Sequence, residues 1–184
     1  MKRSLPTVQS GPAGHGKSGR RTGAPRERLD PPVPLVTVGW VNHAREAGQL
    51  ALQLCAALSE KGLPPAVLLA SEGSEPLPNA SLGQFLEAGA RAAKWVNLPA
   101  QGEAKLLAAA LEELAGAPPV LALGNAPAEF YRPLFSIVVS GHRRQRITDD
   151  AQLMQADLEI TTPSDAIAHE LASLLAGRIK APAR

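Results

Sequence analysis

The sequence predicts an α/β fold, a three-layer sandwich in which a mostly parallel sheet lies between two layers of helices. Aliphatic and β-branched runs recur along the chain, and between them lie segments whose apolar residues repeat at helical spacing. Strands that alternate with helices pair in parallel, because each helix returns the chain to the start of the next strand. With 184 residues and 45% hydrophobic composition, the chain has material for one such domain but not for two large ones.

The first 33 residues do not share this pattern. They lack apolar periodicity, are rich in glycine and proline, and carry seven basic residues before position 30. Such a segment buries too little apolar surface to offset the entropy lost on ordering. We therefore expect a disordered basic tail over 1–33, a folded domain over 34–179 and a short disordered end over 180–184.

The tail contains the stretch "GPAGHGKS", Gly11–Ser18, which fits the phosphate-loop pattern GxxxxGK[ST]. A working phosphate loop needs a strand before it and a helix after it, since the helix N-terminus completes the anion site. Neither element is predicted around residues 11–18. We therefore interpret this match as coincidence.

The domain opens with a strand at "VPLVTVG" (33–39), a β-branched run that ends in glycine. A helix follows, and Gly62 stands where a C-cap glycine is expected. Its predicted buried stripe consists of Ala47, Leu50, Ala51, Leu54, Cys55 and Leu58. A second buried strand is expected at "PAVLLA" (65–70).

The alternation continues to the C-terminus. Further strands are expected at 94–98, 119–124, 134–141 and 157–161. Helices are expected at 81–93, 102–115 and from 164 onward, with a short helical segment at 126–132 and a turn at 149–156. Ser81 and Gln84 form a capping box, and Ser164 has the character of an N-cap. The predicted inward faces are Leu82, Phe85 and Leu86; Leu107, Ala110, Leu111 and Leu114; and Ile167, Leu171, Leu174 and Leu175.

Ligands of parallel sheets bind beyond the carboxyl ends of the strands, so the segment Gly39–Glu46 after the first strand is the first candidate site. Its spacing matches a phosphate loop, but Ala44, Arg45 and Glu46 replace the expected glycine, lysine and hydroxyl residue. A carboxylate at the last position would repel phosphate. The residues that could still bind an anion here are Gly39, Asn42, His43 and Arg45. The alternative is that Arg45 is a solvated residue of the first helical turn.

Three later loops supply further candidates. Asn125 follows the strand at 119–124, and Thr162 with Asp165 lies where some GTPases read guanine, although Ser164 and Asp165 also suit a plain helix start. After the strand at 134–141 comes "SGHRRQR". Its residues His142, Arg143 and Arg144, with Arg146, could hold a phosphate, a pyrophosphate or RNA, or could form a solvated basic loop.

Several segments together resemble the small P-loop NTPases of the molybdopterin-guanine dinucleotide biosynthesis protein B type. The resemblance lies in "VPLVTVG", "QLALQLCAALSEKGL", "PAVLLA", "FLEAGARAAKWV" and "GNAPAEFYRPLFSIVV", and it spans about residues 33–177. It implies a P-loop NTPase-like domain, GTP or a molybdopterin-type cofactor as ligand, and a molybdenum-cofactor maturation protein or molybdoenzyme as partner. The chain departs from the family at its phosphate loop. It departs again at Gly124 and Asn125, where a Mg²⁺-binding acid is expected.

Three functions are left open. Loss of both Mg²⁺-related features favours a catalytically degenerate accessory protein, so we do not expect an active NTPase. The alternative is an atypical GTP- or ATP-dependent enzyme, a GTPase or small-molecule kinase, that uses Arg45 and the basic loop 142–146. A third hypothesis is that the basic tail binds a polyanion while the domain serves as its carrier.

Composition restricts the remaining possibilities. A single cysteine, Cys55, excludes an intrachain disulfide and indicates a cytoplasmic protein, and no apolar run approaches the length of a membrane span. No two of the four histidines lie close together in the sequence and there is no CxxC pair, so no metal site is expected. No aromatic residue interleaves with the arginines of 142–146, which argues against nucleic-acid binding. A homodimer remains open.

Overall fold

The computed structural model describes residues 27–72, 81–99, 103–116, 119–140 and 156–180. They form one six-stranded sheet in the order β3-β2-β4-β1-β5-β6, and every pair of neighbouring strands is parallel. The strands are β1 (Leu35–Val41), β2 (Ala66–Glu72), β3 (Ala92–Leu98), β4 (Val120–Leu123), β5 (Phe135–Ser140) and β6 (Leu158–Ile160). The predicted parallel α/β sandwich is confirmed.

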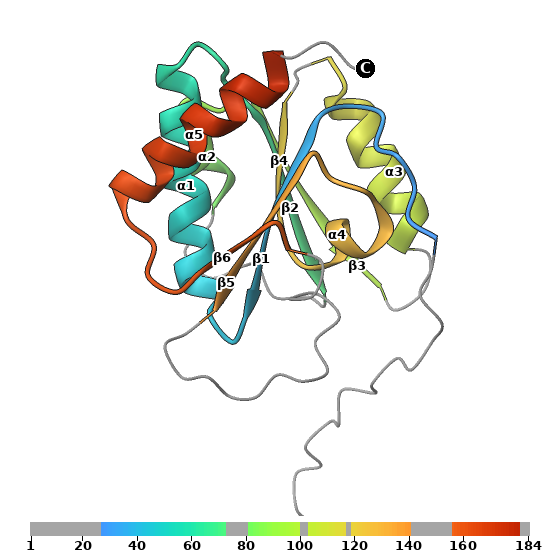
Figure 1. Ribbon diagram of the computed structural model, residues 1–184. Coiled ribbons are helices and arrows are strands. Elements are labelled where there is room, and N and C mark those ends of the chain that lie inside the picture. The colour runs from blue at the N-terminus through green and yellow to red at the C-terminus, as the bar shows by residue number, and fades with distance from the viewer. Residues whose placement is uncertain (1–26, 73–80, 100–102, 117–118, 141–155, 181–184) are drawn as a thin grey trace, which may run out of the picture.

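Helices cover both faces of the sheet (Figure 1). One face carries α1 (Ala44–Glu60), α2 (Leu82–Glu87) and α5 (Asp165–Lys180), and the other carries α3 (Glu103–Leu114) and α4 (Ala126–Phe130). The chain steps outward from β1 to β3 by way of α1 and α2, then returns through α3 to insert β4 between β2 and β1. Along the chain, the helices before β3 (α1 and α2) lie on one face of the sheet, and the next two helices (α3 and α4) lie on the other.

The two faces have separate hydrophobic cores, because side chains alternate between the faces of each strand. The larger core packs α1 and α5 on β1, β4 and β5, and the smaller one packs α3 on β2, β3 and β4. The predicted stripe of α1 is confirmed, since all six of its residues are fully buried. Gly62 follows α1 with φ 73°, as expected of a glycine that ends a helix.

Three sequence expectations differ from the structure. The helix predicted over 81–93 ends at Glu87, because Gly89 takes a φ of 94° and the Arg91 amide then bonds to the Pro65 carbonyl at the start of β3. On α2 only Phe85 is buried, while Leu82 and Leu86 are exposed. On α5 Leu174 is exposed, and Ala168 and Ala172 take inward positions beside Leu171 and Leu175.

The last residues of the predicted tail contact the domain. The Leu29 amide donates to the Phe130 carbonyl at 2.9 Å, and the Arg132 amide donates to the Leu29 carbonyl at 2.8 Å. Val33 is buried in the smaller core. The ordered domain thus begins several residues before 34, and the rest of the predicted tail lies outside the described residues.

None of the helices in the described part of the chain has the length and apolar character needed to span a bilayer.

Candidate functional site

The crevice between the carboxyl ends of β1 and β4 is the place where this fold should bind a ligand. From β1 the chain continues into α1 on one face, and from β4 it continues into α4 on the other. Neighbouring strands whose connections diverge in this way leave a gap between their loops, and ligands of open parallel sheets bind there. Gly39 on the β1 side and Asn125 on the β4 side meet at this gap.

The side chain of Asn125 bridges from the end of β4 to β1. Its Oδ1 accepts a hydrogen bond from the Trp40 amide at 2.8 Å, and its Nδ2 donates to the Trp40 carbonyl at 3.1 Å. β4 pairs with β1 only as far as Leu123 opposite Val38. The side-chain amide of Asn125 therefore takes the place of a further β4 residue opposite Trp40. It gives a hydrogen-bond partner to both the backbone N–H and the backbone carbonyl of Trp40.

Two glycines make this arrangement possible by their lack of a side chain. A Cβ on Gly39 would lie 2.6 Å from Asn125 Oδ1, closer than real Cβ atoms approach an oxygen. Gly124 has φ 142°, and a Cβ there would overlap the carbonyl oxygen of Ala70 on β2. Glycine is therefore required at position 124 by both backbone conformation and space, whereas at position 39 a larger residue would displace the Asn125 side chain.

No extended loop follows Gly39. β1 continues through Trp40 and Val41, which pair with Val139 and Ser140 of β5, and α1 begins at Ala44. Only Asn42 and His43 connect the strand to the helix, and Asn42 has φ 60°, a left-handed conformation that asparagine tolerates. The backbone of 39–46 is therefore a tight strand-to-helix turn and not a curled phosphate cradle.

One of the charged residues at this turn is acidic. Glu46 lies in the first turn of α1, where its carboxylate interacts favourably with the helix dipole, and its Oε2 is 3.6 Å from Nδ1 of His43. His43 occupies the N-cap position without making a side-chain cap hydrogen bond. Arg45 is exposed on the same turn. An incoming anion would meet a carboxylate together with the histidine and arginine.

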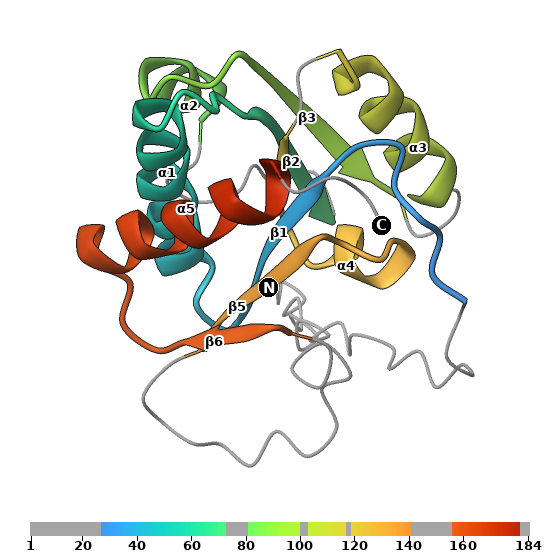
Figure 2. The ribbon, with the colours of Figure 1, turned by 45° about the horizontal axis from the view of Figure 1, so that its top comes forward.

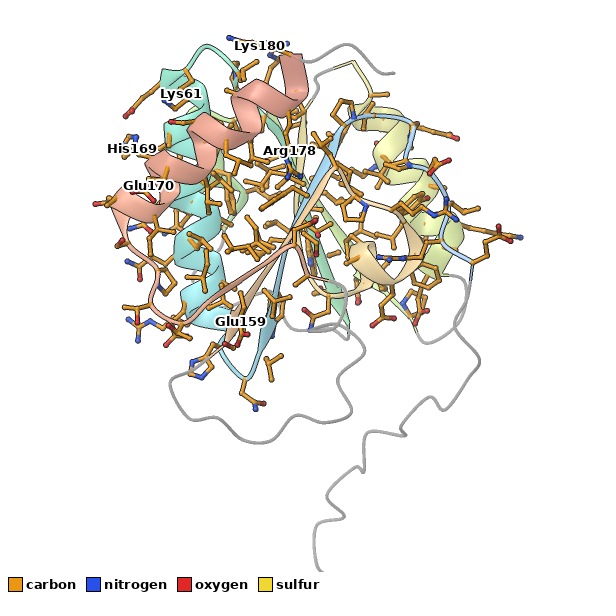
Figure 3. The ribbon with its side chains drawn as sticks, viewed as in Figure 1. Lys61, Glu159, His169, Glu170, Arg178 and Lys180 are labelled. Carbon is orange, nitrogen blue, oxygen red and sulfur yellow. The ribbon has the colours of Figure 1, made fainter. Side chains whose placement is uncertain are left out.

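Thr162 and Asp165 belong to another part of the molecule. Thr162 is exposed in the connection from β6 to α5, and Asp165 is exposed at the first position of α5. The Ser164 hydroxyl accepts the Ile167 amide at 3.3 Å and caps the helix as predicted. Asp165 lines a hollow of about 430 Å³ between α1 and α5. On the same hollow, His169 Nδ1 lies 3.7 Å from Glu60 Oε2, and Figure 3 shows His169 on the outer side of α5.

His142, Arg143 and Arg144 lie outside the described residues. Of the ten candidates, the structure brings together Gly39 and Asn125, with Asn42, His43 and Arg45 on the adjoining turn. The sequence pattern did not predict that Asn125 binds the protein's own backbone. An isolated glycine within a strand pattern was the available signal, because it often marks the close approach of another group.

The clearest pKa shifts lie in packed regions. Burial raises the pKa of the Cys55 thiol to about 11, while a hydrogen bond with Ser59 opposes the shift. The predicted unreactive core cysteine is consistent with this environment. Burial, together with the negative charge of Glu112, also raises the pKa of Tyr131 on the opposite face.

Within the described ranges, no three His, Cys, Asp or Glu side chains converge as metal ligands would. Comparisons of the chain with protein-family models, with curated proteins and with solved structures gave no match. The resemblance to the molybdopterin-guanine dinucleotide biosynthesis protein B type therefore rests on the sequence motifs alone.

Proposed function

We propose that this chain is a catalytically degenerate accessory protein with a P-loop-like α/β fold, which acts by binding a partner and does not hydrolyse nucleotide. One observation carries the proposal: Asn125 occupies the crevice at which such a fold would take a phosphate. A phosphate loop needs several backbone amides that point at one anion. Here the Trp40 amide is already bonded to Asn125.

The turn Asn42–His43 supports the same proposal. β1 remains paired with β5 through Val41, so little backbone is left to wrap around a phosphate chain before α1 begins. Glu46 places a negative charge at the helix N-terminus, where a bound phosphate would otherwise be stabilised.

The sequence motifs suggest which partner to test. Their resemblance to the molybdopterin-guanine dinucleotide biosynthesis protein B type points to molybdenum-cofactor maturation, with a molybdoenzyme or a maturation protein as the partner. We expect the chain to co-elute with a purified enzyme that uses molybdopterin-guanine dinucleotide. Absence of a complex with both the empty and the loaded enzyme would remove this assignment without affecting the proposed lack of hydrolysis.

Nucleotide titration tests the loss of hydrolysis directly. With GTP, ATP and their diphosphates at millimolar concentration and with Mg²⁺, we expect no rise in the thermal midpoint and no phosphate release above a protein-free blank. The informative variant is Ala44→Gly/Arg45→Lys/Glu46→Thr, which restores the phosphate-loop residues. We expect it to remain unable to bind, because Asn125 and the short turn are unchanged.

The competing function is an atypical NTPase that uses Arg45 and the basic loop 142–146. Its signature would be Mg²⁺-dependent phosphate release by the natural chain that Arg45→Ala abolishes and Arg91→Ala, at an exposed arginine before β3, leaves intact. That result would overturn the proposal.

A further inference from the structure

The two edges of the sheet are protected very differently. β6 is only three residues long and contains Glu159, which accepts a hydrogen bond from Ser140. Asp157, directly before the strand, accepts the Ser136 amide at 2.7 Å. Figure 3 shows Glu159 at this edge. A short, charged strand is a common way to prevent pairing with another chain. β6 therefore has the features of a closed edge.

β3, at the opposite end of the sheet (Figure 2), has none of these features. Its seven residues pair with β2 along their whole length, and no described strand pairs with the other side. The strand contains no acid and no proline. Its single charge, on Lys94, is paired with Glu113 of α3. Among the described residues, the backbone groups on the outer side of β3 have no strand partner and are available for pairing.

Trp95 lies at the middle of β3 and is 41% exposed. Its Nε1 donates to the Ser71 hydroxyl at 2.8 Å, so the indole is held in place on β2. Tryptophans that bury a large, rigid surface at little entropic cost often supply much of an interface's binding energy.

α2, which contacts β3, also carries exposed apolar side chains. α2 packs on β3, and its Leu82 and Leu86 are 36% and 51% exposed while Phe85 between them is buried. A strand of seven residues is about 23 Å long. Stable interfaces bury about 1,200–2,000 Å² in total, which strand pairing reaches only with additional side-chain contacts. The tryptophan and the two leucines supply them.

We propose that two copies of this chain form a symmetric dimer by pairing β3 with β3, with Trp95 of each copy at the twofold axis. The pairing is antiparallel and places Ala93 opposite Asn97 and Lys94 opposite Val96. No like charges face one another in this register, and every contact occurs twice. The two six-stranded sheets join into one. The dimer does not depend on the proposed function.

The mass in solution tests the dimer. Light scattering after size exclusion, over a range of concentrations, should give a mass that approaches twice 19.2 kDa. We expect Trp95→Lys to be monomeric with an unchanged far-ultraviolet circular dichroism spectrum. Leu106→Lys, at a residue of α3 that is 42% exposed, should remain dimeric. A monomer at all concentrations, or a Trp95→Lys variant that still dimerises, overturns the proposal.

Disulfide trapping tests the register. In a Cys55→Ala background, a 1:1 mixture of Ala93→Cys and Asn97→Cys chains places two thiols opposite each other on the paired strands and keeps Trp95, whereas either variant alone leaves its thiols separated by the antiparallel offset. Oxidation should cross-link the mixture at least tenfold faster than either variant alone. Equal rates for the mixture and the single variants would show that the chains pair in another way.

Discussion

Asn125 closes the crevice between β1 and β4 with its own amide, and Gly39 provides the space for it. The two hydrogen bonds to Trp40 extend the sheet beyond the last residue of β4. The hydrogen bonds of Asn125 depend on the glycine at position 39, because a Cβ there would press against Asn125 Oδ1. This pair of residues can therefore be tested as a unit.

We expect Asn125→Ala to lower the free energy of unfolding by about 1–3 kcal/mol, because it leaves the Trp40 amide and carbonyl without these partners. Gly39→Ala should lower it by about 1–3 kcal/mol through the forced displacement of Asn125. The double variant Gly39→Ala/Asn125→Ala should lose less unfolding free energy than the sum of the losses in the two single variants, because the clash at position 39 disappears when Asn125 is removed. Urea unfolding measures all three variants. Gln49→Ala, at an exposed amide of α1, is the control, and simple additivity would contradict the proposed contact.

Cys55 makes stability depend on pH. Burial raises the pKa of its thiol to about 11, so between about pH 9 and 11 the folded chain keeps a proton that the unfolded chain has lost. The stabilisation that the neutral thiol gives to the folded chain is fully present below the thiol pKa of the unfolded chain. It is lost as the pH rises from that value through the pKa of the folded chain. The stability gap between the natural chain and Cys55→Ala should therefore be constant up to pH 8 and narrow above pH 9. A constant gap to pH 11 would argue against the buried neutral thiol.

The helices and strands show which local signals are reliable. The stripe of α1 and that of α3 were predicted residue by residue, since both helices are long and lie against the sheet. α2 was predicted too long, because the sequence continues apolar and alanine-rich past Glu87 while Gly89 turns the chain into β3. Leu174 was predicted to face inward, but the buried face of α5 is formed by Ala168, Leu171, Ala172 and Leu175. Periodicity identifies a helix more dependably than it fixes its end or its orientation.

The capping box of α2 was also predicted and is present in full. Ser81 Oγ accepts the Gln84 amide at 3.2 Å, and Gln84 Oε1 accepts the Ser81 amide at 3.0 Å. We expect Ser81→Ala to destabilise the fold by about 1 kcal/mol, because a helix this short depends on its cap. Ser173→Ala, at an exposed serine within α5, should change stability by less than about 0.5 kcal/mol. Denaturant midpoints, with amide exchange at Gln84, compare the two. Equal effects would count against the cap.

In the whole molecule, the segment before β1 belongs to the folded unit. Leu29 bonds to the backbone around α4, and Val33 is buried in the smaller core. A chain that begins at residue 34 should therefore be less stable than one that begins at residue 27 by at least about 2 kcal/mol, from lost apolar burial and lost hydrogen bonds. Equal thermal and urea midpoints for the two chains would show that these contacts contribute nothing.

The layered parallel fold followed from the sequence because it depends on local repetition, namely the alternation of buried strands with amphipathic helices. The mismatch between residues 39–46 and a phosphate loop was also visible there, since residue type alone carries it. Only the tertiary structure decided the state of the candidate site. Asn125 and Trp40 are 85 positions apart, and their contact arises because β4 inserts beside β1. The same long-range packing puts β3, a long strand without acidic residues, at one edge of the sheet and the short β6 with Glu159 at the other. Strand order depends on how the helices cover the sheet and not on any local signal.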